Sequence, residues 1–177
     1  MFEVIALAAP PVRRLTLCAV LTALALALSA AEGLVPLTVI FPLPGLRLGL
    51  ANLVTTYALC RLSGREALLI LAARCLLGAL VGGSLTALAF SLTGGLLALG
   101  TMALLLRCGR FSLFGVSIAG AAAHNTGQIL AAMAVLGSRA PLAYLPPLLL
   151  CSLATGAFTG GVSAMLVRRI PAPLRAD

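Results

Sequence analysis

The chain has 177 residues, of which 62% are hydrophobic and only 9% are charged, whereas soluble domains carry about 25% charged residues. The mean hydropathy is +1.17. This composition excludes a soluble globular enzyme and a disordered protein, and it leaves an integral membrane protein. Because a spanning helix needs about 20 apolar residues, we expect one all-α membrane domain over residues 1–177 with six transmembrane helices.

Apolar stretches separated by proline, glycine and arginine predict where the spans lie. The first span follows Arg13 and Arg14, and the loop after it carries Pro36, Pro42 and Pro44, which cannot continue a helix. An alternative interpretation of the first stretch is a signal peptide cleaved after a small-residue site at residues 29–31. The expected helices are residues 15–31, 46–62, 66–81, 84–106, 112–136 and 142–167, with a long loop at 32–45.

The basic residues predict the orientation of this domain. All 12 are arginines, and they stand singly or in pairs between apolar stretches rather than in a patch that would bind nucleic acid. With six spans, nine arginines fall on the side of the two termini: Arg13, Arg14, Arg61, Arg65, Arg107, Arg110, Arg168, Arg169 and Arg175. Only Arg47 and Arg139 fall on the other side. The positive-inside rule therefore predicts a multi-pass protein of the cell inner (cytoplasmic) membrane, with cytoplasmic termini and an external loop at 32–45.

The chain lacks the residues that several catalytic and metal-binding sites require. The chain has no lysine and therefore no phosphate-binding P-loop. Its one aspartate is Asp177, so the paired aspartates that hold magnesium and diphosphate are missing. Its five cysteines are scattered without a CxxC pair, and His124 has no second ligand nearby in sequence. We expect no enzyme activity, no cofactor and no metal site.

Small residues recur at helical spacing in the first span. Ala19, Ala23, Ala27 and Ala31 follow one another at intervals of four and form one ridge on a helix. Small ridges let helices approach closely in lipid. The ridge serves either packing within the bundle or docking of a partner, and the pattern alone leaves both open. Three GxxxG pairs, Gly45/Gly49, Gly78/Gly82 and Gly156/Gly160, predict tight internal packing.

Polar residues at membrane depth are costly and mark functional sites by default. We expect them to converge on a substrate pocket that opens outward beneath the loop at 32–45. The alternative is a hydrogen-bond network that only fixes helix packing, with Arg74 paired to Glu32. The candidate binding residues are Glu32, Arg47, Asn52, Arg74, His124, Asn125 and Gln128.

Four strings in the chain are similar to a known family. They are EGLVPLTVIFPLPGLRLGLAN at 32–52, FSLFGVSIAGAAAHNTGQ at 111–128, YLPPLLL at 144–150 and TGAFTGG at 155–161. Together they resemble the Gx transporter family, which is labelled heptaprenyl diphosphate synthase component I and is related to the S components of energy-coupling-factor vitamin transporters. The resemblance implies an S-component-like bundle of six helices and a substrate pocket lidded by the loop after helix one. It also implies that Ala19, Ala23 and Ala27 dock a transmembrane coupling subunit.

The residues and the resemblance together lead to one expected function. We expect a substrate-binding membrane subunit of a small-molecule uptake system, which relies on a coupling subunit and ATPases in other chains. Arg47 and Arg74 would meet an anionic group of the ligand, and the amides and His124 would orient it. Glu32 would hold Arg47 or bind a cationic part of the ligand. The alternatives are an accessory membrane subunit of isoprenoid or quinone synthesis and a structural component of an extracellular electron-transfer complex.

Overall fold

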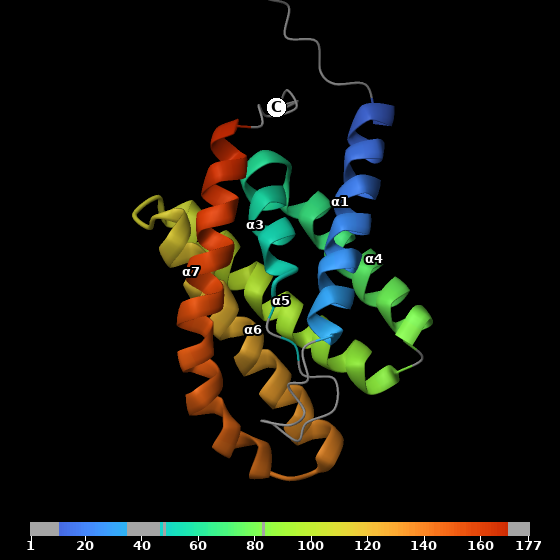
Figure 1. Cartoon of the computed structure of the whole chain (residues 1–177), viewed down its shortest axis with the longest axis vertical. Coiled ribbons are helices and arrows are strands. Elements are labelled where there is room, and N and C mark those ends of the chain that lie inside the picture. The colour runs from blue at the N-terminus through green and yellow to red at the C-terminus, as the bar shows by residue number, and fades with distance from the viewer. Residues whose placement is uncertain (1–10, 35–46, 48, 83, 170–177) are drawn as a thin grey trace, which may run out of the picture.

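The computed structural model describes residues 11–34, 47, 49–82 and 84–169. Within these residues the chain forms six α-helices and one short 3-10 helix, and it contains no β-strand (Figure 1). Most of the loop predicted at 32–45 lies outside the described residues. The elements are α1 (Pro11–Gly33), α3 (Asn52–Arg61), α4 (Gly64–Gly82), α5 (Leu85–Cys108), α6 (Leu113–Leu136), η1 (Ala140–Tyr144) and α7 (Leu145–Arg169).

Length and composition make this a membrane protein. Three stretches are long and apolar enough to cross a bilayer: Val12–Gly33, Leu85–Cys108 and Ala140–Arg169. Helices α4 and α6 have 19 and 24 residues; Arg74 lies on α4, and His124, Asn125 and Gln128 lie on α6. Helices α5 and α6 begin at serine N-caps, Ser84 and Ser112, and end at glycines in the left-handed conformation.

The second predicted span differs from the structure. We expected a helix over 46–62, but α3 begins at Asn52 and has ten residues, which gives it a length of about 15 Å. Residues Arg47 and Gly49–Ala51 are not helical. Gly49 has a φ of +86°, a left-handed conformation that a right-handed helix cannot contain. The apolar composition of this stretch did not reveal the break.

Helices α5, α6 and α7 pack closely because glycines face neighbouring backbones. A Cβ on Gly127 would lie 2.7 Å from the Cα of Gly94, and a Cβ on Gly156 would lie 2.5 Å from the Cα of Ile118. Gly160 meets the backbone of α6 in the same way. The packing predicted for Gly156 and Gly160 is therefore present, as expected for small residues at helix interfaces in lipid. The prediction is wrong for Gly78 and Gly82, because a Cβ on Gly82 would meet no atom of the described residues within 4 Å and one on Gly78 would meet only the Leu26 side chain, at 3.5 Å. Gly45 lies outside the described residues.

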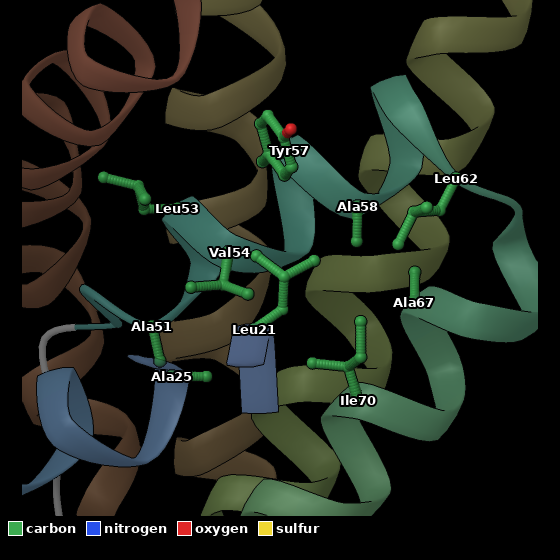
Figure 2. Packing of buried hydrophobic residues seen from close by; sticks show 10 residues of the cluster. All are labelled: Leu21, Ala25, Ala51, Leu53, Val54, Tyr57, Ala58, Leu62, Ala67 and Ile70. Atoms are coloured by element: carbon green, nitrogen blue, oxygen red, sulfur yellow. The ribbon is translucent and has the colours of Figure 1, made fainter. Parts of the chain in front are cut away.

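Helices α1, α3 and α4 share a separate apolar core (Figure 2). Leu21 and Ala25 of α1 meet Val54 and Ala58 of α3 there, and Ile70 of α4 completes the group. Among the described elements α1 contacts α4 and, less extensively, α3. Helix α1 therefore lies at the edge of the bundle, with one face packed on α3 and α4 and another face exposed in the described part of the chain.

The arginine-bearing helix ends gather at one end of the bundle. The start of α1 and the end of α7 both lie at the top of Figure 1, the end that also holds the connection from α3 to α4. Arg61 donates a hydrogen bond to the carbonyl of Val167, and Arg14 lies 4.0 Å from the carboxylate of Glu66. The polar residues of the candidate site lie away from this end.

Candidate substrate-binding site

The site is organised around the non-helical residues that precede α3. The side-chain oxygen of Gln128 accepts the backbone N–H of Arg47 at 3.3 Å, and the carboxylate of Glu32 accepts the N–H of Leu50. Non-helical backbone at membrane depth is tolerated only where protein groups or water satisfy it. Glu32 of α1 and Gln128 of α6 accept these backbone hydrogen bonds. The fold therefore stabilises the non-helical conformation before α3.

Two arginines converge on Ser29 near the end of α1. Arg47 donates from Nη1 to the carbonyl of Ser29, and Arg74 donates from Nη1 to its Oγ at 3.1 Å. No ion pair within 4.0 Å joins Glu32 to either arginine in the described part of the chain, where the one such pair is Arg14–Glu66. The carboxylate of Glu32 accepts a hydrogen bond from the backbone N–H of Leu50 instead of pairing with a guanidinium.

Several polar atoms in this region are buried without a hydrogen-bond partner among the described residues. Arg74 is 5% exposed, and Asn52, His124 and Gln128 are at most 2% exposed. Burying a polar group without a partner costs roughly 1–3 kcal/mol. The unpartnered atoms are both side-chain polar atoms of Asn52, both ring nitrogens of His124, Nε2 of Gln128, and Nε and Nη2 of Arg74.

Glycines bring these groups close together. A Cβ on Gly49 would lie 2.9 Å from Nδ2 of Asn52 and 3.2 Å from the ring of His124. A Cβ on Gly94 would lie 3.0 Å from both His124 and Gln128, and one on Gly95 would lie 3.3 Å from Nη2 of Arg74. The structure therefore gathers Glu32, Arg47, Asn52, Arg74, His124 and Gln128 around one junction of α1, α4, α5 and α6.

Asn125 stands apart from this group. Its Nδ2 donates to the carbonyl of Leu148 at 3.0 Å and to Oγ of Ser152 at 2.9 Å. It therefore points to α7, although one face of α6 was expected to carry it with its neighbour His124. Adjacent helical residues are about 100° apart, which is enough to direct them to different neighbours.

The space beside the arginines is small. A cavity of about 20 Å³ is lined by Ser29, Arg47, Arg74 and Ser91, with apolar residues of α4 and α5 around them. Such a volume holds about one water molecule, whereas ligand pockets measure about 300–1,000 Å³. The described part of the site is closed around its polar groups.

The sequence reasoning missed Ser29, Gly49, Gly94 and Gly95 as parts of the site. Ser29 was noticed only as a small residue. The Gly94–Gly95 pair within an otherwise apolar stretch was the available signal, because adjacent glycines in a helix mark a close approach.

Comparison with known families identifies the chain. The family described as heptaprenyl diphosphate synthase component I matches residues 21–166, which include every residue of the junction. The chain belongs to this family. No curated protein and no solved structure was found to match.

The donor set of this family member does not suit a metal-bound diphosphate. Such a group needs clustered carboxylates, and the junction offers Glu32 beside two arginines. Within the described residues no three His, Cys, Asp or Glu side chains lie together in a way that would hold a metal ion. The residues present offer guanidinium, amide and imidazole groups instead, which recognise oxyanions and polar ligands by hydrogen bonds.

The alanine ridge of α1 faces away from the bundle. Ala19, Ala23, Ala27 and Ala31 are exposed, whereas Ala25 between them is fully buried. Ala19 and Ala23 line an apolar groove of about 630 Å³ between α1 and α4, with Arg14 and Glu66 at one end. The ridge is not used for packing within the described part of the chain.

Proposed function

We propose that this protein is the substrate-binding membrane subunit of a small-molecule uptake system of the energy-coupling-factor type. Its ligand is anionic or polar and enters from outside the cell inner membrane. The observation that carries the proposal is the set of buried, unpartnered polar atoms on Asn52, Arg74, His124 and Gln128 around a non-helical segment. Discontinuous helices near the membrane midplane commonly form substrate sites in transporters.

A network that only fixed packing would leave few polar atoms unpartnered. Buried polar groups in folded proteins are nearly always hydrogen-bonded, as the Ser117–Thr159 pair is here. Most of the unpartnered atoms in the described part of the chain belong to Asn52, Arg74, His124 and Gln128, and the others are Oδ1 of Asn125 and Nε of Arg14 and Arg61. A ligand that bound at the junction would supply the missing partners there, once the non-helical residues moved to admit it.

Transport also requires a partner, because the chain has no ATP-binding motif. The exposed alanines of α1 and the adjoining groove support docking of a transmembrane coupling subunit, which in turn binds ATPases. Close approach of helices in lipid depends on such small side chains. In this proposal the cytoplasmic end of the bundle carries the clustered arginines.

The proposal is tested by mass spectrometry of small molecules that co-purify with the protein. We expect wild-type protein to carry one small molecule in near-stoichiometric amount and Gln128→Leu to carry at least tenfold less. Thr126→Val is the matched control, since the Thr126 hydroxyl donates only to the carbonyl of Ala122 in its own helix. If no small molecule co-purifies, or if both variants retain it equally, the binding function is wrong.

A second candidate function follows from the family's name. As a component of a synthase, the chain would be a non-catalytic membrane partner of a prenyl diphosphate synthase in isoprenoid or quinone synthesis. Co-purification of a prenyl-transferring enzyme, in place of a coupling subunit with ATPases, would favour this role. A flavin-bearing lipoprotein partner would instead favour the electron-transfer alternative.

A further inference from the structure

The guanidinium of Arg74 has one side fixed and one side free. Nη1 is anchored to Oγ of Ser29 at 3.1 Å, whereas Nε and Nη2 have no hydrogen-bond partner among the described residues. The N–H groups on Nε and Nη2 point in the same direction and form a fork that matches the two oxygens of a carboxylate. Anchoring Nη1 pre-orients this fork before a ligand arrives.

The fork is enclosed without being given a hydrogen-bond partner among the described residues. Nη2 lies beside Gly95, where a Cβ would approach it to 3.3 Å. Arg74 is 5% exposed, and a charge at membrane depth is costly. A buried fork of this kind is costly unless an anion occupies it.

The charges at the junction do not balance among themselves. The charged side chains that face it in the described part of the chain are Arg47, Arg74 and Glu32, and they sum to one positive charge. His124 is buried without an acidic partner, which disfavours a charged ring. One negative charge on the ligand would neutralise the junction, whereas a diphosphate would leave an excess of negative charge in a buried site.

The uncharged groups add a second requirement. Asn52 has both a donor and an acceptor unpartnered, and His124 and Gln128 contribute further unpartnered nitrogens. His124 and Gln128 approach Gly94, and Arg74 approaches the next residue, Gly95. A ligand that reaches both Arg74 and these groups therefore needs a polar but uncharged body beside its anionic group.

We infer that the ligand is a monocarboxylate with an uncharged hydrogen-bonding body, and that its carboxylate binds bidentately to Nε and Nη2 of Arg74. This inference rests on the proposed binding function and gives its ligand class. It excludes phosphate esters and diphosphates as the recognised group. Arg47 adds positive charge beside the carboxylate, while Glu32 holds the backbone of the non-helical segment.

The test titrates small-molecule probes into the purified full-length protein in detergent. The measured quantity is the melting temperature of the protein. Benzoate is the monocarboxylate probe and tests the fork alone, because its ring carries no hydrogen-bonding group. Benzamide is its uncharged counterpart, and inorganic pyrophosphate is the polyanion. We expect benzoate to raise the melting temperature saturably, and benzamide and pyrophosphate to have little effect. Stabilisation by pyrophosphate or by benzamide at least equal to that by benzoate would overturn the inference without any variant being made.

Two variants then locate the probe. Arg74→Lys keeps the charge and loses the fork, so its apparent Kd for benzoate should rise at least tenfold, or about 1.4 kcal/mol. Arg65→Lys is the matched control because Arg65 is exposed at the start of the same helix, and it should bind benzoate as the wild type does. An unchanged Kd in a folded Arg74→Lys protein would also overturn the inference.

This test is separable from that of the proposed function. A co-purified small molecule that is neutral or polyanionic would support a binding subunit and refute the carboxylate fork. Fork-dependent benzoate binding without any co-purified ligand or uptake would leave the carboxylate site in place and refute the transport role.

Discussion

At the residue scale, the junction depends on three glycines, which have no side chain, as much as on its polar residues. Gly49, Gly94 and Gly95 stand where a Cβ would meet Asn52, His124, Gln128 or Arg74 within about 3.3 Å. Each glycine lets backbone lie directly against a polar side chain. The polar atoms are thereby enclosed without being given partners, which a ligand would supply in the proposed function.

Gly49→Ala tests the left-handed turn before α3. Alanine at a φ of +86° costs about 1–2 kcal/mol, and its Cβ would lie 2.9 Å from Nδ2 of Asn52. We expect a lower melting temperature and weaker ligand retention. Gly64→Ala is the control, since a Cβ there meets no atom within 4 Å, and it should behave as the wild type. Equal melting temperatures for the two variants would contradict the conformation described for Gly49.

At the element scale, α1 has two faces with different tasks. Leu21 and Ala25 join the core shared with α3 and α4 (Figure 2), while the ridge at 19, 23, 27 and 31 is exposed. Four-residue spacing predicted that these alanines share a face, but spacing could not say which face the bundle covers. That depends on the neighbours of α1, which only the folded structure supplies.

Ala23→Leu and Ala25→Leu separate docking from packing. Leucine at position 23 adds bulk to an exposed surface, so the isolated protein should keep its melting temperature while recovery of the coupling subunit falls severalfold in pull-down. Leucine at position 25 enters a position with 0% exposure, where overpacking costs about 1–3 kcal/mol. If Ala23→Leu lowers the melting temperature as much as Ala25→Leu does, the ridge is a packing surface and the docking proposal fails.

The same scale shows where sequence reasoning reached its limit. Five of the six expected helices coincide with α1, α4, α5, α6 and α7 to within a few residues, because long apolar runs bounded by arginine, glycine and proline leave little choice. The second did not, because the stretch 46–62 is mostly apolar yet has a left-handed residue at Gly49. An apolar composition indicates that a segment is compatible with lipid. It does not reveal a break in the helix when protein side chains accept hydrogen bonds from the exposed backbone N–H groups, as Gln128 and Glu32 do here.

At the scale of the whole molecule, charge and chemistry occupy different parts of the bundle. Arg61 and Val167 meet where α3 and α7 end, and Arg14 and Glu66 meet where α1 and α4 begin. The unpartnered polar atoms lie deeper, at the junction of α1, α4, α5 and α6. In the proposed orientation the arginine-rich end faces the cytoplasm, and the junction lies away from that end.

The orientation is tested by reporters on the full-length chain. Arginines concentrate on the cytoplasmic side of membrane proteins, so a reporter joined to the C-terminus and one inserted at Gly109, which ends α5, should both be active as cytoplasmic fusions. A reporter inserted at Ser138, between α6 and η1, should be active only as an external one. The Ser138 fusion serves as the internal control, because it differs from the Gly109 fusion by a single helix, α6. If the Gly109 and Ser138 fusions report the same side, α6 does not span the membrane. If the C-terminal and Gly109 fusions are external, the bundle is inverted and the junction faces the cytoplasm, where an uptake subunit could not receive its ligand.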